Sequence, residues 1–274
     1  MVIYGVGAAT YYDLWSSSAN SWVVTGGATP SYTGTRNWLR IAGDPKPDSN
    51  YIAYSSLDGK SDWNVTIWNG YSWAAIPAEN PSLETNAARC IDVSWEKDSG
   101  VCMFVAGDRN SRELTYIGWS EAMGWYDPVS GSTTTPAYPF TTPAGTLSLS
   151  RDINWTGLIS DPNENKMICY IIDQANDLTT INWSGTNWTG ATNHELTVSD
   201  RTKECASIAL DKHDIIVPAI IDVQGGDDNW RNSSGTAYNI QFQDEGGSYL
   251  NRFEIKSTTG TGIGSQVILD WSKV

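Results

Sequence analysis

Acidic and basic side chains recur at matching positions along the chain, and they are the first candidates for chemistry. Each acid closes a short apolar run, and each arginine opens the run before it. Two carboxylates facing each other across a cavity can cleave a glycosidic bond, whereas carboxylates and arginines in turns cap amides and form ion pairs. Eight residues either cap turns and form ion pairs or line a polar funnel that binds a small ligand: Asp58, Asp108, Asp173, Asp222, Arg36, Arg89, Arg151 and Arg201. Only the four aspartates among them could supply the carboxylate pair of a glycoside hydrolase.

Other catalytic patterns are absent from the sequence. The two histidines, His194 and His213, are isolated in polar surroundings, and no Gly-x-Ser-x-Gly segment supplies a nucleophile beside them. No Cys/His spacing indicates zinc, and no glycine-rich loop follows a strand to hold phosphate. We therefore assign no catalytic residue, no metal and no cofactor. The sequence favours a protein without catalytic activity but leaves open whether it is an enzyme.

The elements that position these residues follow from an internal repeat. Pairs of aromatic residues flank a short turn at intervals of roughly 50–65 residues. Such pairs pack across a hairpin, or they stack on sugars where they are exposed. The pairs are Trp15 and Trp22, Trp68 and Trp73, Trp119 and Trp125, Trp183 and Trp188, and Phe242 and Tyr249.

Two apolar runs precede most of these pairs, and both end at polar turns. Runs of this length between Asp, Pro, Asn and Gly clusters predict strands joined by hairpins. The first runs are 38–44, 90–96, 155–161 and 205–211, and the second runs are 51–58, 101–108, 167–173 and 215–222. With the aromatic pair around a third turn, each unit has four strands.

Units of four strands predict an all-β, five-bladed β-propeller formed by the whole chain, 1–274. The last apolar segment, 266–271, is a first strand without a second, and residues 1–5 are a second strand without a first. We expect the C-terminal strand to join the N-terminal blade and close the ring. The alternative is a β-sandwich or solenoid. The expected blades are 1–30 with 262–274, 31–82, 83–135, 150–198 and 199–260.

Two long irregular segments, 126–150 and 223–235, are expected on the same face as the eight charged candidates. Long loops on a rigid scaffold often carry binding sites. The second segment contains Asp227, Asp228 and Trp230, which are candidate ligand contacts. Trp230 contacts a ligand or folds back over its own blade; the sequence leaves both open.

The net charge of −14 disfavours nucleic acid as a partner, because the 17 Lys and Arg residues are scattered singly. No apolar run is long enough to span a membrane, and the N-terminus lacks the pattern of a signal peptide. Four cysteines, Cys90, Cys102, Cys169 and Cys205, are more in keeping with buried thiols than with disulfides.

The unit resembles Trp-rich β-propeller repeats of surface-displayed microbial and viral proteins. The similarity lies in a first strand ending in Asp-Pro, a second ending in Asp, and a third closing in Trp-x-Gly-x-x-Trp. In five-fold count and circular closure the chain is similar to tachylectin-type lectins. The resemblance covers nearly the whole chain as a pattern and assigns no binding residue.

These observations favour a non-catalytic binding or structural module on an exterior surface. Extracellular or virion display is expected, as a decoration, spike or adhesion protein. Its partners are then neighbouring proteins of the assembly or surface glycans. Two alternatives remain: a five-bladed glycoside hydrolase with a carboxylate pair in the central funnel, and a multivalent lectin with one weak site per blade.

Overall fold

The computed structural model describes residues 1–30, 34–60, 62–74, 88–107, 112–133, 140–143, 146, 147, 149, 151–198 and 204–210, and the backbone of strands 216–221, 238–243 and 249–255. Every regular element in these ranges is a β-strand, and all strand pairs are antiparallel. Within the same ranges no helix has the length and apolar character that a bilayer crossing requires.

The described strands form five sheets that follow one another along the chain. The first contains β1 (Val2–Val6), β2 (Ala9–Ser16) and β3 (Ser21–Ala28). The second contains β4 (Arg36–Gly43), β5 (Ile52–Asp58) and β6 (Trp63–Trp68). The third contains β7 (Ile91–Trp95), β8 (Cys102–Gly107), β9 (Leu114–Ser120), β10 (Gly124–Tyr126) and β11 (Phe140–Thr141). The fourth contains β12 (Ile153–Ser160), β13 (Met167–Asp173), β14 (Leu178–Trp183) and β15 (Trp188–Glu195). The fifth contains β16 (Ala206–Leu210), β17 (Ile216–Ile221), β18 (Tyr238–Gln243) and β19 (Tyr249–Ile255).

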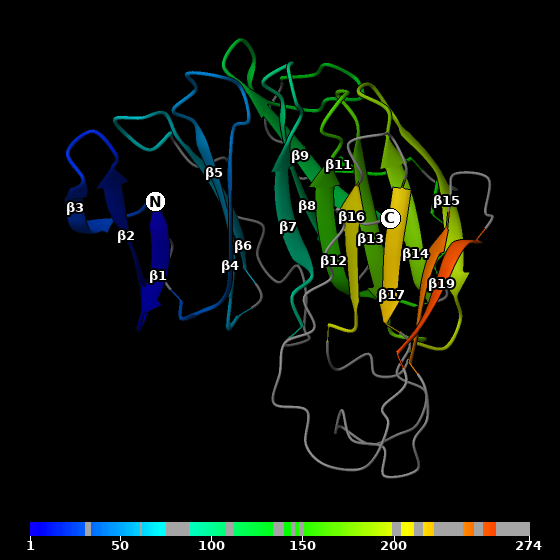
Figure 1. The fold of residues 1–274 in the computed structure, drawn as a ribbon. Helices are drawn as coiled ribbons and strands as arrows, with labels where there is room; N and C mark the ends of the chain where they lie inside the picture. The colour runs from blue at the N-terminus through cyan, green and yellow to red at the C-terminus, as the bar shows by residue number, and fades with distance from the viewer. Residues whose placement is uncertain are drawn as a thin grey trace, which may run out of the picture.

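The first four sheets stand side by side in chain order (Figure 1), from β1–β3 in blue to β12–β15 in green, and the fifth, β16–β19 in yellow and orange, overlaps the fourth in this view. The opening strands of neighbouring sheets are in contact, β4 with β7, β7 with β12 and β12 with β16. We call β4, β7, β12 and β16 the inner strands. Among the described strands, none pairs the first sheet with the last. The segment expected to close a ring, 266–271, lies outside the described residues.

The expected first and second runs of the four later units are confirmed as paired strands. The run predicted at 90–96 is β7 and the run predicted at 101–108 is β8. Apolar and polar residues alternate along β7, as expected for a strand with one buried face. Ile91, Val93 and Trp95 are buried, while Asp92 and Ser94 are partly exposed. All residues of β8 are buried, since sheets cover both of its faces.

The third sheet contains a strand that the sequence pattern did not reveal. After β10 the chain leaves the sheet and returns as β11, which pairs with the earlier part of β9. Residues 140–141 therefore extend the sheet beyond residue 135, within the segment that the repeat pattern left between two units.

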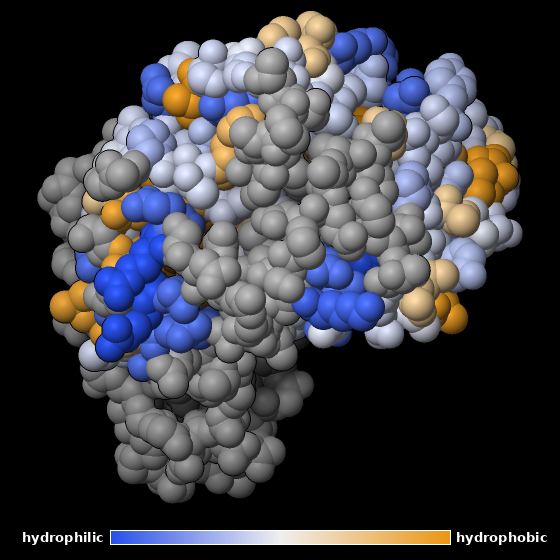
Figure 2. All heavy atoms as spheres, turned by 180° about the vertical axis from the view of Figure 1, so that it is seen from behind, coloured by the Kyte–Doolittle hydropathy of each residue, from blue (hydrophilic) through white to orange (hydrophobic). Residues whose placement is uncertain are grey.

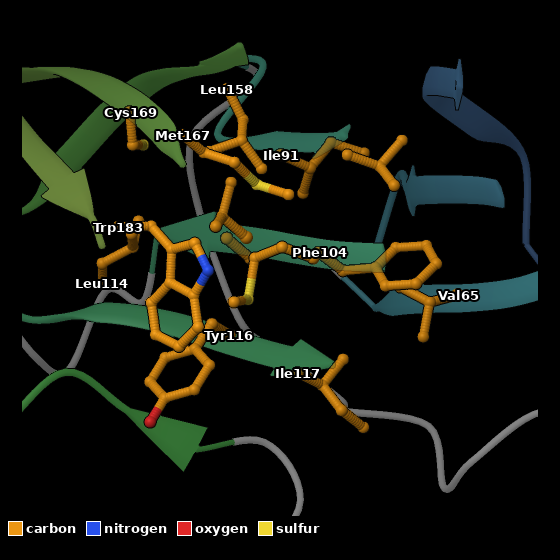
Figure 3. Close-up of a cluster of buried hydrophobic side chains, with 14 of the residues drawn as sticks. Val65, Ile91, Phe104, Leu114, Tyr116, Ile117, Leu158, Met167, Cys169 and Trp183 are labelled. Atoms are coloured by element: carbon orange, nitrogen blue, oxygen red, sulfur yellow. The ribbon is translucent and has the colours of Figure 1, made fainter. Parts of the chain in front are cut away.

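The main apolar core lies between the second, third and fourth sheets. Figure 3 shows Phe104 of β8 extending toward Val65 of β6, and Trp183 and Met167 of the fourth sheet on the other side. These side chains are fully or almost fully buried, and each contributes about 1.5–3 kcal/mol by leaving water. This core holds the three central sheets in fixed relation.

Two thiols, Cys102 and Cys169, are free and buried within this core. Cys90 is also buried, and Cys205 is partly exposed.

Candidate functional site on the inner strands

Two of the predicted acids hold hairpin turns. The Oδ1 atom of Asp58 accepts hydrogen bonds at 2.8 and 2.9 Å from the backbone N–H groups two and four residues later. Asp173 repeats this geometry in the fourth sheet, at 2.7 and 3.0 Å. Both carboxylates are buried. Their position at the ends of β5 and β13 supports the turn-capping interpretation for these two residues.

The arginines that open the strands lie beside these acids. Arg36 is the cross-strand partner of Asp58, and its Nη1 lies 3.7 Å from Oδ2, with both side chains buried. Arg151 is exposed, and its backbone N–H donates to Oδ2 of Asp173 at 3.0 Å. Each acid is therefore engaged by its own sheet.

The remaining predicted site residues, except Arg89, fall outside the described residues. They are Asp108, Asp222, Arg201, Asp227, Asp228 and Trp230.

Arg89 lies at the centre of a cluster that joins three sheets. Its guanidinium forms an ion pair with Glu204, just before β16, with Nε 3.4 Å from Oε2. The hydroxyl of Tyr170, on β13, donates to the same carboxylate at 2.5 Å and accepts from Nη2 of Arg89 at 3.3 Å. The Arg89 side chain is only 3% exposed. Its charge is therefore neutralised within the protein.

The same guanidinium also binds backbone of two sheets. Nη1 of Arg89 donates to the carbonyl of Ile91 at 3.0 Å and to that of Thr156, on β12, at 2.7 Å. The Thr156 N–H in turn donates to the carbonyl of Arg89 at 3.3 Å. Arg89 thus connects the third and fourth sheets through main chain and the fifth through Glu204.

A second arginine brings in the second sheet. Nε of Arg40, on β4, lies 3.5 Å from Asp92 on β7, and its Nη2 lies 4.0 Å from Glu204. Asp92 also lies 3.8 Å from Arg89 and accepts from the Leu158 N–H at 2.8 Å. Arg40, Arg89, Asp92, Tyr170 and Glu204 form what we call the inner charged cluster. It contains two guanidinium and two carboxyl groups.

Burial and pairing act in opposite directions on these groups. Burial raises the pKa of Asp92 above its usual value, although the Leu158 amide and both arginines counteract it. Burial also acts to raise the pKa of Glu204, but hydrogen bonds from Tyr170 and Arg89 and the charges of the two arginines outweigh it, so the pKa is lowered. Of the two carboxyl groups in the cluster, Glu204 is therefore the one whose charged form is favoured.

An aromatic contact crosses the centre beside this cluster. Trp38 of β4 and Trp155 of β12 meet edge to face, with ring centroids 5.8 Å apart. These residues belong to the second and fourth sheets, so they meet past the third. Cys205 packs against the same buried group. Trp38 and Trp155 therefore bring the inner strands of the second and fourth sheets into side-chain contact.

The four Trp pairs are confirmed as cross-strand pairs at hairpins. Ring centroids lie 5.4 Å apart in three of them, and the fourth is paired in register on β9 and β10. The predicted pair of Phe242 and Tyr249 is wrong by one residue. A register shift makes Phe242 the partner of Asn251 and Gln243 the partner of Tyr249.

Trp pairs also contact the preceding sheet. Trp68 and Trp73 pack on Tyr12 of the first sheet, with centroids 5.3 and 5.5 Å apart. Trp119 packs on Tyr51 of the second sheet at 5.0 Å. Trp188 packs on Tyr116 of the third sheet at 5.8 Å. A contact between a Trp pair and a tyrosine of the preceding sheet thus occurs at three successive junctions, although the tyrosines stand at different positions in their sheets.

The junction of the third and fourth sheets adds a buried hydrogen bond. Nε1 of Trp183 donates to Oε1 of Glu96 at 2.5 Å, and the Ser99 hydroxyl donates to the other oxygen. Burial raises the pKa of Glu96, while these two donors lower it in part. The acid predicted to end the first run of the third unit therefore also connects two sheets.

The inner charged cluster was missed by reasoning from the repeat, apart from Arg89. A signal was present, because Arg40 and Asp92 each stand four residues before the acid that ends the first run of their unit, Asp44 or Glu96. Opposite charges at equivalent positions of adjacent inner strands predict an ion pair. In the described ranges, no group of three or more His, Cys, Asp or Glu residues is placed to hold a metal ion.

No family model matches the sequence, and no curated protein matches it. Among solved structures, the chain is similar to a mutant of the Aleuria aurantia lectin in complex with alpha-methyl-L-fucoside. The sequences are 13% identical, the match covers 93% of this chain and 72% of that one, and the TM-score is 0.42. Values this low identify no family for the chain.

Proposed function

We propose that this chain is a non-catalytic binding or structural module displayed on an exterior surface. In this proposal its five sheets are the blades of a closed β-propeller, and segment 266–271 adds the missing inner strand to the first sheet. Two observations support the closure. The first sheet has three described strands, and the inner strands of the later sheets already lie against one another.

The four described acids of the candidate site support the non-catalytic part of the proposal, because each of them already caps a turn or pairs with an arginine. A glycoside hydrolase needs two carboxylates about 5–10 Å apart with space for the sugar between them. Asp58 and Asp173 are buried in turns, and Asp92 and Glu204 are held by arginines. Trp38 and Trp155 bring the inner strands of the second and fourth sheets into contact. The described part of the centre thus favours a stable scaffold over a reaction chamber.

Burial of Trp residues at the hairpins of the second, third and fourth sheets disfavours one sugar site per sheet, although Trp15 and Trp22 of the first sheet are 44% and 48% exposed. Trp68, Trp119, Trp183 and Trp188 are buried, and they pack on protein rather than face solvent. Sugar stacking requires an exposed ring face. We therefore place the binding function on loops, and we propose Asp227, Asp228 and Trp230 as contact residues. The partner is a neighbouring protein of a surface or virion assembly, or a surface glycan.

Binding and hydrolysis measured on the same preparation test this proposal. We expect the full chain to bind an assembly protein or a glycan on an array, and to leave chromogenic glycosides uncleaved. Trp230→Ala should reduce binding without changing the melting temperature. Tyr71→Ala, which removes an aromatic side chain that is 87% exposed elsewhere, is the matched control and should bind normally. Glycoside cleavage, or equal binding by both variants, would overturn the proposal.

A further inference from the structure

Five Asn-x-Ser/Thr sequons occur in the sequence, and each is an acceptor motif for an N-linked glycan. They begin at Asn64, Asn154, Asn182, Asn187 and Asn232. The structure describes the first four, and Asn232 lies outside the described residues. A glycan is bulky and hydrated, so its asparagine has to stand at the surface of the folded chain. Burial therefore decides which of the four sequons can carry one.

Three of the described sequons begin within strands. Asn64 on β6 is 2% exposed, and Asn154 on β12 is 6% exposed. Every residue of β6 is buried, and β12 lies against β7. Asn182 is half-buried on β14, which is paired on both sides. A glycan on Asn64 or Asn154 would force apart sheets that the close-packed core holds together.

The fourth, Asn187, lies in the turn between β14 and β15 and is exposed. Backbone groups and Ser184 hold this turn. The Asn187 N–H donates to Oγ of Ser184 at 3.1 Å, and the Asn187 carbonyl accepts from the Ser184 N–H at 2.9 Å and from its hydroxyl at 3.0 Å. The side-chain Nδ2 of Asn187 lies 3.5 Å from Oγ1 of Thr186, which is long for a hydrogen bond. The amide nitrogen can therefore be substituted without loss of the contacts that hold the turn.

The hydroxyl residue of the same sequon is accessible as well. Thr189 is exposed on β15, and its Oγ1 donates to the carbonyl of Asn182 at 3.2 Å. In the view from behind (Figure 2), the side of the molecule that carries β14 and β15 comes to lie on the left, and pale, weakly polar residues cover much of its upper part. A glycan on Asn187 thus extends into solvent from a surface of similar polarity.

We infer that Asn187 is the N-glycan acceptor that the folded chain offers, and that Asn64 and Asn154 carry no glycan in the folded protein. The donor is a lipid-linked oligosaccharide. Nδ2 of Asn187 forms a bond to C1 of the first sugar, and the bond from C1 to the lipid pyrophosphate breaks. The lipid pyrophosphate leaves, and the amide nitrogen gives up one proton. This modification goes beyond the proposed binding function and does not depend on the binding residues named there.

Production of the full-length chain behind a cleavable secretion signal in a eukaryotic host tests the inference. Peptide N-glycosidase converts each glycosylated asparagine to aspartate, which peptide mass spectrometry then locates. We expect a glycan on Asn187 and none on Asn64 or Asn154. Asn187→Gln and Thr189→Ala should each remove this glycan. Thr186→Ala, at an exposed neighbour outside the motif, is the matched control and should keep it.

Two outcomes of this experiment overturn the inference. One is a secreted, folded chain without a glycan on Asn187. The other is a glycan on Asn64 or Asn154 in a chain that melts at the same temperature as unmodified protein from a bacterial host. Neither outcome touches the proposed binding function, because binding is measured separately on unmodified protein.

A second measurement needs no secretion. In the bacterially produced full chain, Asn187→Cys should react rapidly with a maleimide-linked polymer and keep its melting temperature, because the turn has room for a bulky adduct. The wild-type chain, in which Cys90, Cys102 and Cys169 are buried, gives the background rate. Labelling of Asn187→Cys no faster than this background, or a fall in melting temperature of several degrees on labelling, would overturn the inference.

Discussion

Replacing Arg89 with methionine tests the inner charged cluster most directly. Methionine keeps an apolar stem of similar length and removes all five N–H donors. The carbonyls of Ile91 and Thr156 lose their donor, and Glu204 loses its closest counter-charge. The substitution thus removes contacts to the fourth and fifth sheets together with the local contacts to Ile91 and Asp92 of the third.

The expected loss in unfolding free energy follows from burial. Removing one partner of a buried ion pair costs about 3–5 kcal/mol, and an unsatisfied buried carbonyl costs about 1–3 kcal/mol. Glu204 is one-third exposed and regains water when Arg89 is removed, so the lower end applies. We expect a loss of about 3 kcal/mol for Arg89→Met. In a chain of this size that corresponds to a fall in melting temperature of about 6–12 °C.

Urea unfolding followed by tryptophan fluorescence measures this loss of unfolding free energy. Two further variants show whether the loss comes from the interaction of Arg89 with Glu204. Glu204→Gln should cost about 1–3 kcal/mol, because the amide oxygen still accepts from Tyr170 but the buried Arg89 guanidinium loses its closest counter-charge and keeps only Asp92 nearby. The double variant should be less unstable than the sum of the two, because the interaction can be lost only once. Lys166→Met, at an ion pair with Glu164 in which both side chains are about half exposed, is the control and should change stability by under about 0.5 kcal/mol. Equal losses for Arg89→Met and Lys166→Met would refute the reasoning.

Three further predictions concern single sites. Burial raises the pKa of Glu96, so wild-type stability should fall as pH rises from about 4.3, the unfolded value, through the higher native value. Glu96→Gln should reduce that slope in urea midpoints measured at several pH values, and Asp92, whose pKa is also raised, supplies the remainder. Asp173→Ala should cost about 1–3 kcal/mol in thermal unfolding, because buried turn amides lose their acceptor. The thiols of Cys102 and Cys169 should react slowly with a disulfide reagent in the native protein and rapidly in urea, because burial raises their pKa and blocks access.

Each of these has a control. Glu164→Gln changes a carboxylate that is half exposed and should leave the pH profile unaltered, so a matching slope change in both variants would contradict the role of burial at Glu96. Asp173→Asn keeps an acceptor oxygen and should lose less stability than Asp173→Ala; the reverse order would contradict turn capping. Rapid native labelling of Cys102 or Cys169 would contradict their placement in the core.

Much of the strand pattern could be predicted from the sequence, because local chemistry determines it. Acids such as Asp58 and Asp173 end strands where they can cap the following turn. Tryptophans such as Trp183 and Trp188 mark both sides of a hairpin. These signals act within a few residues and need no knowledge of the neighbouring sheet.

Contacts between sheets could not be predicted in the same way, because they depend on how sheets twist and face one another. Trp38 and Trp155 belong to sheets that are separated by a third one in chain order. Their contact cannot be inferred from the spacing of residues along the chain. The shift at Phe242 arises from an irregularity in β18 and β19, which displaces a pair that spacing alone would align. The excursion between β10 and β11 similarly hides a strand that resumes later.

The inner strands also limit how such a chain can be rearranged during evolution. Four residues before the closing acid, successive units carry Arg40, Asp92, Gly157 and Ser207. Copying the second unit over the third would place two arginines where Arg40 now meets Asp92. The aromatic hairpins tolerate such an exchange better, because each needs only a tyrosine on the unit before it. Duplication of units is therefore compatible with the outer strands of the sheets. The charged residues of the inner strands, by contrast, require the units to stand in their present order.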